Sequence, residues 1–182
     1  MMKIVRTFFI IIVIACVAVT GVFAADEKLI GLGFTPTELM YKMNNFSKKE
    51  GLPSLISDIE KLPGSPEDIN DVYRSTISEN LIIQMTTHKG DKNINAIAVI
   101  ATPKNNDESM LTMMTYGTII AACSPHANTE TRGKMLLTLM QDENGNLNKK
   151  QSIGMKDVKY TFSSSEITGL MFFVENRTDA DR

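Results

Sequence analysis

Apolar residues recur in this chain with two different periods, and the order of the periods constrains the fold more than any other feature. Apolar and polar residues alternate over 72–78 and 81–88, and a nearly continuous apolar run follows over 94–101. Helical spacing then appears over 106–123 and 130–140, and alternation returns near the end of the chain. Alternation is typical of strands, whereas repeats at three and four residues are typical of helices. Strands that occur in blocks joined by short turns predict antiparallel pairing.

The clearest local signal is a helix start at Thr35. Thr35, Pro36 and Glu38 form a capping box, with threonine at the N-cap, proline at the first helical position and glutamate three residues after the cap. Apolar residues at helical spacing follow this cap, and the pattern ends at Gly51. Glycine is favoured at the position just after a helix. We therefore expect a helix over about 36–50.

The predicted class is α+β, with a largely antiparallel sheet of about five to six strands and helices on one face. The expected order is α-β-β-β(-β)-α-α-β-β. The last hairpin is expected to pair a strand around 158–162 with one over 167–175, and 142–150 is expected to be a polar turn. This order is similar in topology to secretion-chaperone-like folds. The resemblance concerns the order of elements alone, and fold does not determine function.

Residues 1–24 have the pattern of a secretory signal peptide. Lys3 and Arg6 form a cationic start, and residues 7–18 are apolar except for Thr7. Small or aliphatic residues occupy the positions that a signal peptidase reads, so cleavage is expected before Ala25. The sequence therefore predicts a secreted or periplasmic protein.

Removing the signal peptide changes the composition of what folds. Of the 182 residues, 158 remain, and the loss of two basic residues and no acidic one lowers the formal net charge from -2 to -4. One α+β domain is expected over 25–175, followed by a flexible tail over 176–182. One cysteine remains, so no internal disulfide is expected. Because there is no excess of basic residues, nucleic acid is excluded as a partner.

A second processing route remains open at Cys16. The residues Val13-Ile14-Ala15-Cys16 resemble a bacterial lipoprotein box, in which the cysteine is lipidated after cleavage. The protein would then be an envelope lipoprotein tethered through Cys16. The residues that follow Cys16 are apolar, whereas the tether after a lipidated cysteine is usually polar. Membrane contact is expected only through the signal or this lipid anchor.

Cys123 and His126 are the residues on which an enzymatic function would depend, with Glu130 as an acid. A cysteine beside a histidine can form a reactive thiolate. Here the two lie three residues apart at the end of a helix, where the helix dipole raises the pKa of a thiol. We therefore expect a buried structural cysteine and a solvent-facing histidine. No motif for a cofactor or a metal occurs in the chain, and no cofactor is expected.

Methionines at helical spacing form the remaining candidate. Met110, Met113 and Met114 lie on one face of the predicted helix over 106–123, where we expect them to pack in the core. A groove formed by Met110, Met114 and His126 is the functional alternative, for a small apolar ligand or a helix of a protein partner.

The function predicted from the sequence is an exported, non-enzymatic binding or interaction domain at the bacterial cell envelope. The prediction rests on an export signal, a complete core pattern and the lack of a catalytic motif. The alternatives are a secreted enzyme with a site around Cys123 and His126, and the lipoprotein anchored at Cys16.

Overall fold

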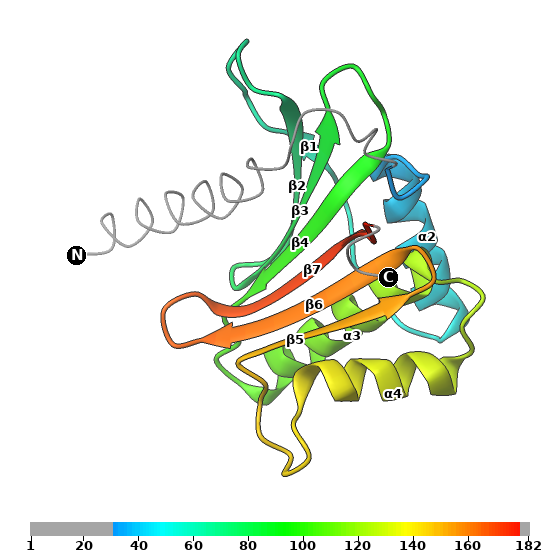
Figure 1. Cartoon of the computed structure of the whole chain (residues 1–182), viewed down its shortest axis with the longest axis vertical. Helices are drawn as coiled ribbons and strands as arrows, with labels where there is room; N and C mark the ends of the chain where they lie inside the picture. Colours follow the sequence, from blue (N-terminus) through cyan, green and yellow to red (C-terminus); the bar gives the residue numbers. More distant parts are fainter. Residues whose placement is uncertain (1–30, 179–182) are drawn as a thin grey trace.

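The computed structural model describes residues 31–178. The predicted signal peptide, Cys16 and residues 179–182 lie outside the described residues. Those described form three helices and one sheet of seven strands (Figure 1). The helices are α2 (Pro36–Lys49), α3 (Asn106–Cys123) and α4 (Thr129–Met140). The strands are β1 (Glu60–Lys61), β2 (Asn70–Ser78), β3 (Leu81–His88), β4 (Ile94–Ala101), β5 (Lys150–Met155), β6 (Val158–Ser165) and β7 (Gly169–Asn176).

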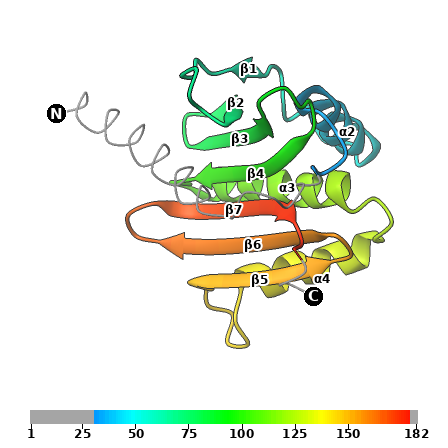
Figure 2. The ribbon, with the colours of Figure 1, turned by 45° about the horizontal axis from the view of Figure 1, so that its top comes forward.

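Every neighbouring pair of strands in the sheet is antiparallel, in the order β1-β2-β3-β4-β7-β6-β5. Two blocks of hairpins meet at the centre, where β4 pairs with β7 and Ile97 lies opposite Val174. Between the blocks, α3 and α4 carry the chain from the middle of the sheet to its far edge (Figure 2). The predicted α+β class and antiparallel pairing are confirmed.

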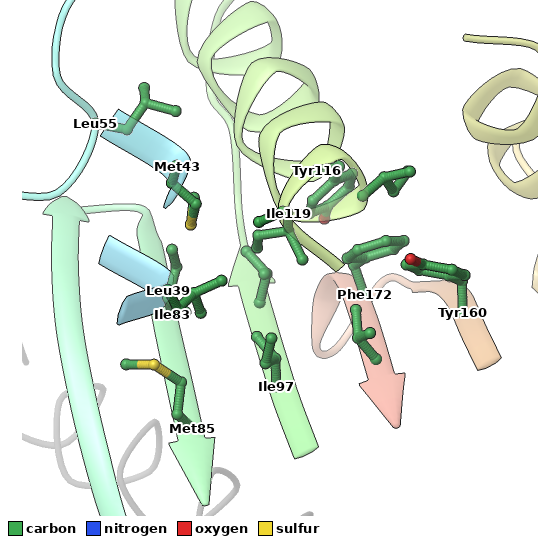
Figure 3. Packing of buried hydrophobic residues seen from close by; sticks show 14 of the residues in the cluster. Leu39, Met43, Leu55, Ile83, Met85, Ile97, Tyr116, Ile119, Tyr160 and Phe172 are labelled. Atoms are coloured by element: carbon green, nitrogen blue, oxygen red, sulfur yellow. The ribbon is translucent and has the colours of Figure 1, made fainter. Parts of the chain in front are cut away.

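All three helices pack on one face of the sheet, as predicted, and the core lies between the helices and that face (Figure 3). Aromatic rings fill its centre. Tyr116 of α3 stacks on Phe172 of β7, with ring centroids 4.7 Å apart, and Tyr160 of β6 lies on the other side of Phe172 at 6.1 Å. Below α2 the core is aliphatic, and it includes Leu39, Met43, Ile83, Met85 and Ile97.

Helix α2 begins where the capping box predicts. The Thr35 side chain accepts a hydrogen bond from the Glu38 N–H at 3.2 Å, and the Thr35 N–H donates to the Glu38 carboxylate at 2.8 Å. These bonds lower the pKa of Glu38. Asn44, on the same helix, holds the loop that follows: its side chain donates to the Ile56 carbonyl and accepts from the Leu55 and Ile56 N–H groups. The loop between α2 and β1 is thereby fastened to the helix.

The sheet has one more strand than the upper limit of the prediction. Strand β5 occupies Lys150–Met155, although no strand was expected between the predicted helix over 130–140 and residue 158. Its outward residues are polar and it lies at an edge, so its apolar alternation is weak. The last hairpin also turns later than expected, at residues 166–168, because Gly169 takes a positive φ of 74° that favours glycine. A Cβ at this position would lie 2.5 Å from the Ala101 carbonyl oxygen.

The first described residues extend the sheet beyond the end of β7. The Leu32 N–H donates to the Ile94 carbonyl at 2.7 Å, and the Ile94 N–H donates to the Phe34 carbonyl at 2.9 Å. The Asn176 side chain donates to the Gly31 carbonyl at 3.0 Å. Asn176 is the last residue of β7, so the strand takes in the first residue of the predicted tail.

Candidate functional site

Cys123 is the last residue of α3, and its surroundings suppress thiolate formation. Its side chain is half-buried, and it forms no disulfide. Burial raises the pKa of the Cys123 thiol to about 12, an effect that the charge of Lys42 only partly offsets. A thiol nucleophile needs the opposite shift. The sequence predicted a buried cysteine, whereas the Cys123 side chain is half-buried; its structural role stays a prediction.

The loop after Cys123 is held by polar contacts that serve packing. The Ser124 hydroxyl lies 2.7 Å from the Tyr160 hydroxyl in a buried hydrogen bond. The Arg132 guanidinium donates to the Ala127 carbonyl at 2.8 Å and lies over the Phe46 ring at 5.0 Å from its centroid. These contacts join the loop to β6, α4 and α2. They account for the position of the loop.

His126 is exposed in this loop, and no hydrogen bond joins it to Cys123 within the described residues. Glu130, the acid of the enzymatic alternative, forms an ion pair with Lys134 at 2.6 Å on the exposed side of α4. The three residues of the enzymatic hypothesis are therefore near one another along the chain but are not joined into a hydrogen-bonded triad.

The expectation that the methionines of α3 all pack in the core is wrong for two of them. Met110 is 63% exposed and Met113 is 40% exposed, while Met114 is half-buried. The opposite side of the helix faces the core, and it carries Thr112, Thr115, Tyr116, Ile119 and Ile120.

Threonine burial explains this rotation of the helix. The hydroxyls of Thr112, Thr115 and Thr118 donate to carbonyls of the preceding turn at 2.8–2.9 Å. A hydroxyl satisfied by its own helix can be buried without an external partner. Methionine is more apolar than threonine, so hydropathy alone predicts the opposite orientation at these positions.

The predicted groove does not bring its three residues together. Met110 lies in the first turns of α3, whereas His126 follows the end of the helix. At 1.5 Å per residue, the helix places about 20 Å between Met110 and Cys123. Met114 lies one turn from Met110 and far from the loop.

A different surface emerges from the outer sides of α3 and α4. Leu137 of α4 is 52% exposed, like the two methionines of α3. The same outward sides carry Gly117 and Gly133, and a Cβ at either position would meet no atom within 4 Å. We call these five residues the α3–α4 surface: Met110, Met113, Gly117, Gly133 and Leu137. The spacing of the methionines along α3 is the sequence signal for this surface, although the same spacing also fits a core-facing stripe.

No metal centre or membrane-spanning helix is evident in the part of the chain that is described. Residues 31–178 contain no group of three or more His, Cys, Asp or Glu side chains placed to hold a metal ion. No helix among them combines the length and the apolar character that are needed to cross a membrane. Within residues 31–178, the α3–α4 surface is therefore not accompanied by a metal site or a membrane-spanning helix.

Comparison with known proteins adds no assignment. No family model, no curated protein and no solved structure matches this chain. The similarity in topology to secretion-chaperone-like folds stays a prediction. What the molecule does has to be inferred from the arrangement of its own residues.

Proposed function

We propose that this protein is an exported, non-enzymatic interaction domain of the bacterial cell envelope that binds a helix of a partner protein on the α3–α4 surface. The export signal in residues 1–24 supports the location. The observation that carries the proposal is the exposure of Met110, Met113 and Leu137 on one helical layer. Large apolar side chains grouped on a surface are typical of interaction sites.

The chemistry of the surface favours a helix as its occupant. Methionine side chains adapt to different apolar partners because they are flexible and polarisable. Gly117 and Gly133 leave open space beside them, so a second helix can approach the backbone closely. Glycine inside a helix costs about 1 kcal/mol relative to alanine, and no contact within the described residues offsets that cost. A partner helix presenting an apolar face would fill this space.

Site-specific photo-crosslinking in the native bacterium tests the proposal. A photoreactive phenylalanine analogue replaces Met113 or Leu137 in one set of cells, and Tyr41 in the control. Tyr41 is 60% exposed and lies on α2, which carries none of the five residues of the α3–α4 surface. We expect one protein adduct of the same mass from positions 113 and 137, none from position 41, and loss of that adduct on Met110→Glu.

The same cells test the location. A mature N-terminus at Ala25 in the envelope fraction, read by mass spectrometry, is expected. A cytoplasmic chain that keeps residues 1–24 would contradict export, and a lipid-modified N-terminal Cys16 would establish the lipoprotein alternative. Identical adducts from all three positions, or none from positions 113 and 137, would overturn the helix-binding surface.

A further inference from the structure

Strand β5 forms a free edge of the sheet (Figure 2). It pairs with β6 on one side only, in the register that sets Lys150 opposite Ser163. The Ser164 N–H donates to the Lys149 carbonyl at 3.0 Å. Backbone groups of an antiparallel strand point alternately toward and away from the neighbour. The N–H and C=O groups of Lys150, Ser152 and Gly154 therefore point away from β6.

Nothing in the described part of the chain occupies these outward groups. No hydrogen bond of residues 31–178 ends on the backbone of Lys150, Ser152 or Gly154. The opposite edge is different, since β1 has only two residues and offers little to pair with. At about 3.3 Å per residue, β5 presents an edge about 20 Å long. An edge of this length is a template for a further strand.

The ends of this edge are basic, although the whole chain has a net charge of -2. Lys149 and Lys150 are exposed at its start, and Lys156 is exposed just after its end. These three side chains form no ion pair within the described residues. The Arg177 side chain lies against Gly154 and donates to the Lys156 carbonyl at 3.2 Å. Lysines can also protect an edge from pairing, but here the middle of the strand is left uncharged.

The two faces of β5 differ in polarity. Register places Ile153 opposite Tyr160 and Met155 opposite Val158, so both half-buried apolar side chains lie on the helical side of the sheet. Lys150 and Ser152 lie on the other side. A strand added to this edge would therefore alternate between apolar residues on the helical side and residues that face lysine on the other.

We propose that β5 accepts an extended acidic segment of a partner protein as an eighth strand. The segment's backbone would pair with Lys150, Ser152 and Gly154, while its carboxylates approach Lys150 on the face away from the helices and Lys149 and Lys156 at the two ends of the edge. The span from Lys149 to Lys156 corresponds to about eight extended residues. Acidic and apolar residues alternate in such a segment. This mode of binding takes its affinity from backbone hydrogen bonds and its specificity from alternate side chains.

A second copy of the chain is a less favourable occupant of the edge. Self-pairing of β5 would bring the lysines of both copies to the same junction, and like charges near each other across strands are destabilising. The edge also differs from the α3–α4 surface in what it binds, since one takes a strand and the other a helix. The two sites can therefore be tested independently.

The test uses one pair of variants at Ser152. Ser152→Pro removes an N–H that points outward, and proline is tolerated at such a position in an edge strand. Ser152→Ala keeps that N–H and, like the proline variant, loses the hydroxyl that bonds to Thr161. The probe is a fluorescent eight-residue peptide of alternating Glu and Val, and a Lys-Val peptide serves as its charge-reversed counterpart. Binding is followed by fluorescence anisotropy at low and high salt.

We expect the Glu-Val peptide to bind the wild type and the alanine variant equally. Its affinity for the proline variant should be lower by a factor of about ten or more. Added salt should weaken binding, and the Lys-Val peptide should not bind. Equal binding to the proline and alanine variants, or equal binding of both peptides, would overturn the proposal. So would a dimer of the wild type, seen by sedimentation, that Ser152→Pro dissociates.

Two controls keep the outcome interpretable. Circular dichroism checks that each variant folds. If the proline variant does not fold, amide exchange of the wild type by NMR decides: added Glu-Val peptide should protect the amides of Lys150, Ser152 and Gly154, and unchanged exchange there would refute the site. Met113→Glu should bind the peptide normally, which separates a failure of the β5 site from a failure of the α3–α4 surface.

Discussion

Two buried tyrosines allow the same substitution to be made in two opposite environments. Tyr116 and Tyr160 are both fully buried and both contact the Phe172 ring. The Tyr160 hydroxyl is bonded to Ser124 at 2.7 Å, whereas the Tyr116 hydroxyl has no partner within the described residues. Burial raises the pKa of both phenols, so both are neutral at physiological pH. Replacement by phenylalanine removes one oxygen and leaves each ring in place.

The expected effects differ in sign. Tyr160→Phe removes a buried hydrogen bond and leaves the Ser124 hydroxyl, itself buried, without a partner. The free energy of unfolding should fall by about 1–3 kcal/mol, the cost of an unsatisfied buried group. Tyr116→Phe removes an oxygen that already lacks a partner. Stability should stay unchanged or rise by about 1–2 kcal/mol, because the cost of burying that oxygen disappears.

Thermal unfolding of the chain from residue 25 onward, followed by circular dichroism, measures both values. For a domain of this size, 1 kcal/mol corresponds to a shift in Tm of about 2–4 °C. The two midpoints should therefore separate clearly, with wild type between them or level with the Tyr116 variant. An equal loss of stability in both variants would refute the reasoning, since hydrogen bonding of the hydroxyl would then not decide the effect.

Three further predictions concern single residues. Cys123 should react with iodoacetamide at pH 8 on the order of a thousandfold more slowly than a free thiol, because a pKa of about 12 leaves little thiolate, and fast alkylation of the folded chain would contradict this. Asn44→Ala should lower the free energy of unfolding by about 2–3 kcal/mol, since three backbone groups lose their partner, whereas the exposed Asn45→Ala should have little effect. In thermal unfolding, Gly133→Ala should stabilise the domain by about 0.5–1 kcal/mol. Gly169→Ala should destabilise it, because the new Cβ would meet the Ala101 carbonyl. A more stable Gly169 variant than Gly133 variant would contradict the geometry.

Local signals were sufficient for the helices and for most of the sheet. The capping box at Thr35 predicted the start of α2, because its hydrogen bonds lie within four residues of chain. Alternation over 72–78 and 81–88 and the apolar run over 94–101 predicted the β2-β3-β4 block, because these patterns also extend over short stretches of chain. Strand β5 was missed because an edge strand buries little on either side, so its sequence carries a weak pattern.

The candidate surfaces depended on tertiary structure. Hydropathy favoured the methionines of α3 for the core, but the threonines satisfied their own hydroxyls and took that place, so Met110 and Met113 face outward. Similarly, the small basic cluster around β5 acquires meaning only once the strand is known to lie at an open edge.

By itself, the sequence determined the class of fold, the helix boundaries and the expectation of export, because periodicity, capping residues and a signal pattern act over short stretches of chain. Tertiary structure decided which face of α3 is buried, which strand forms the free edge and whether Cys123 can ionise. Those properties depend on contacts between residues distant in the chain, such as the aromatic stack of Tyr116 on Phe172, and on the burial that such contacts produce.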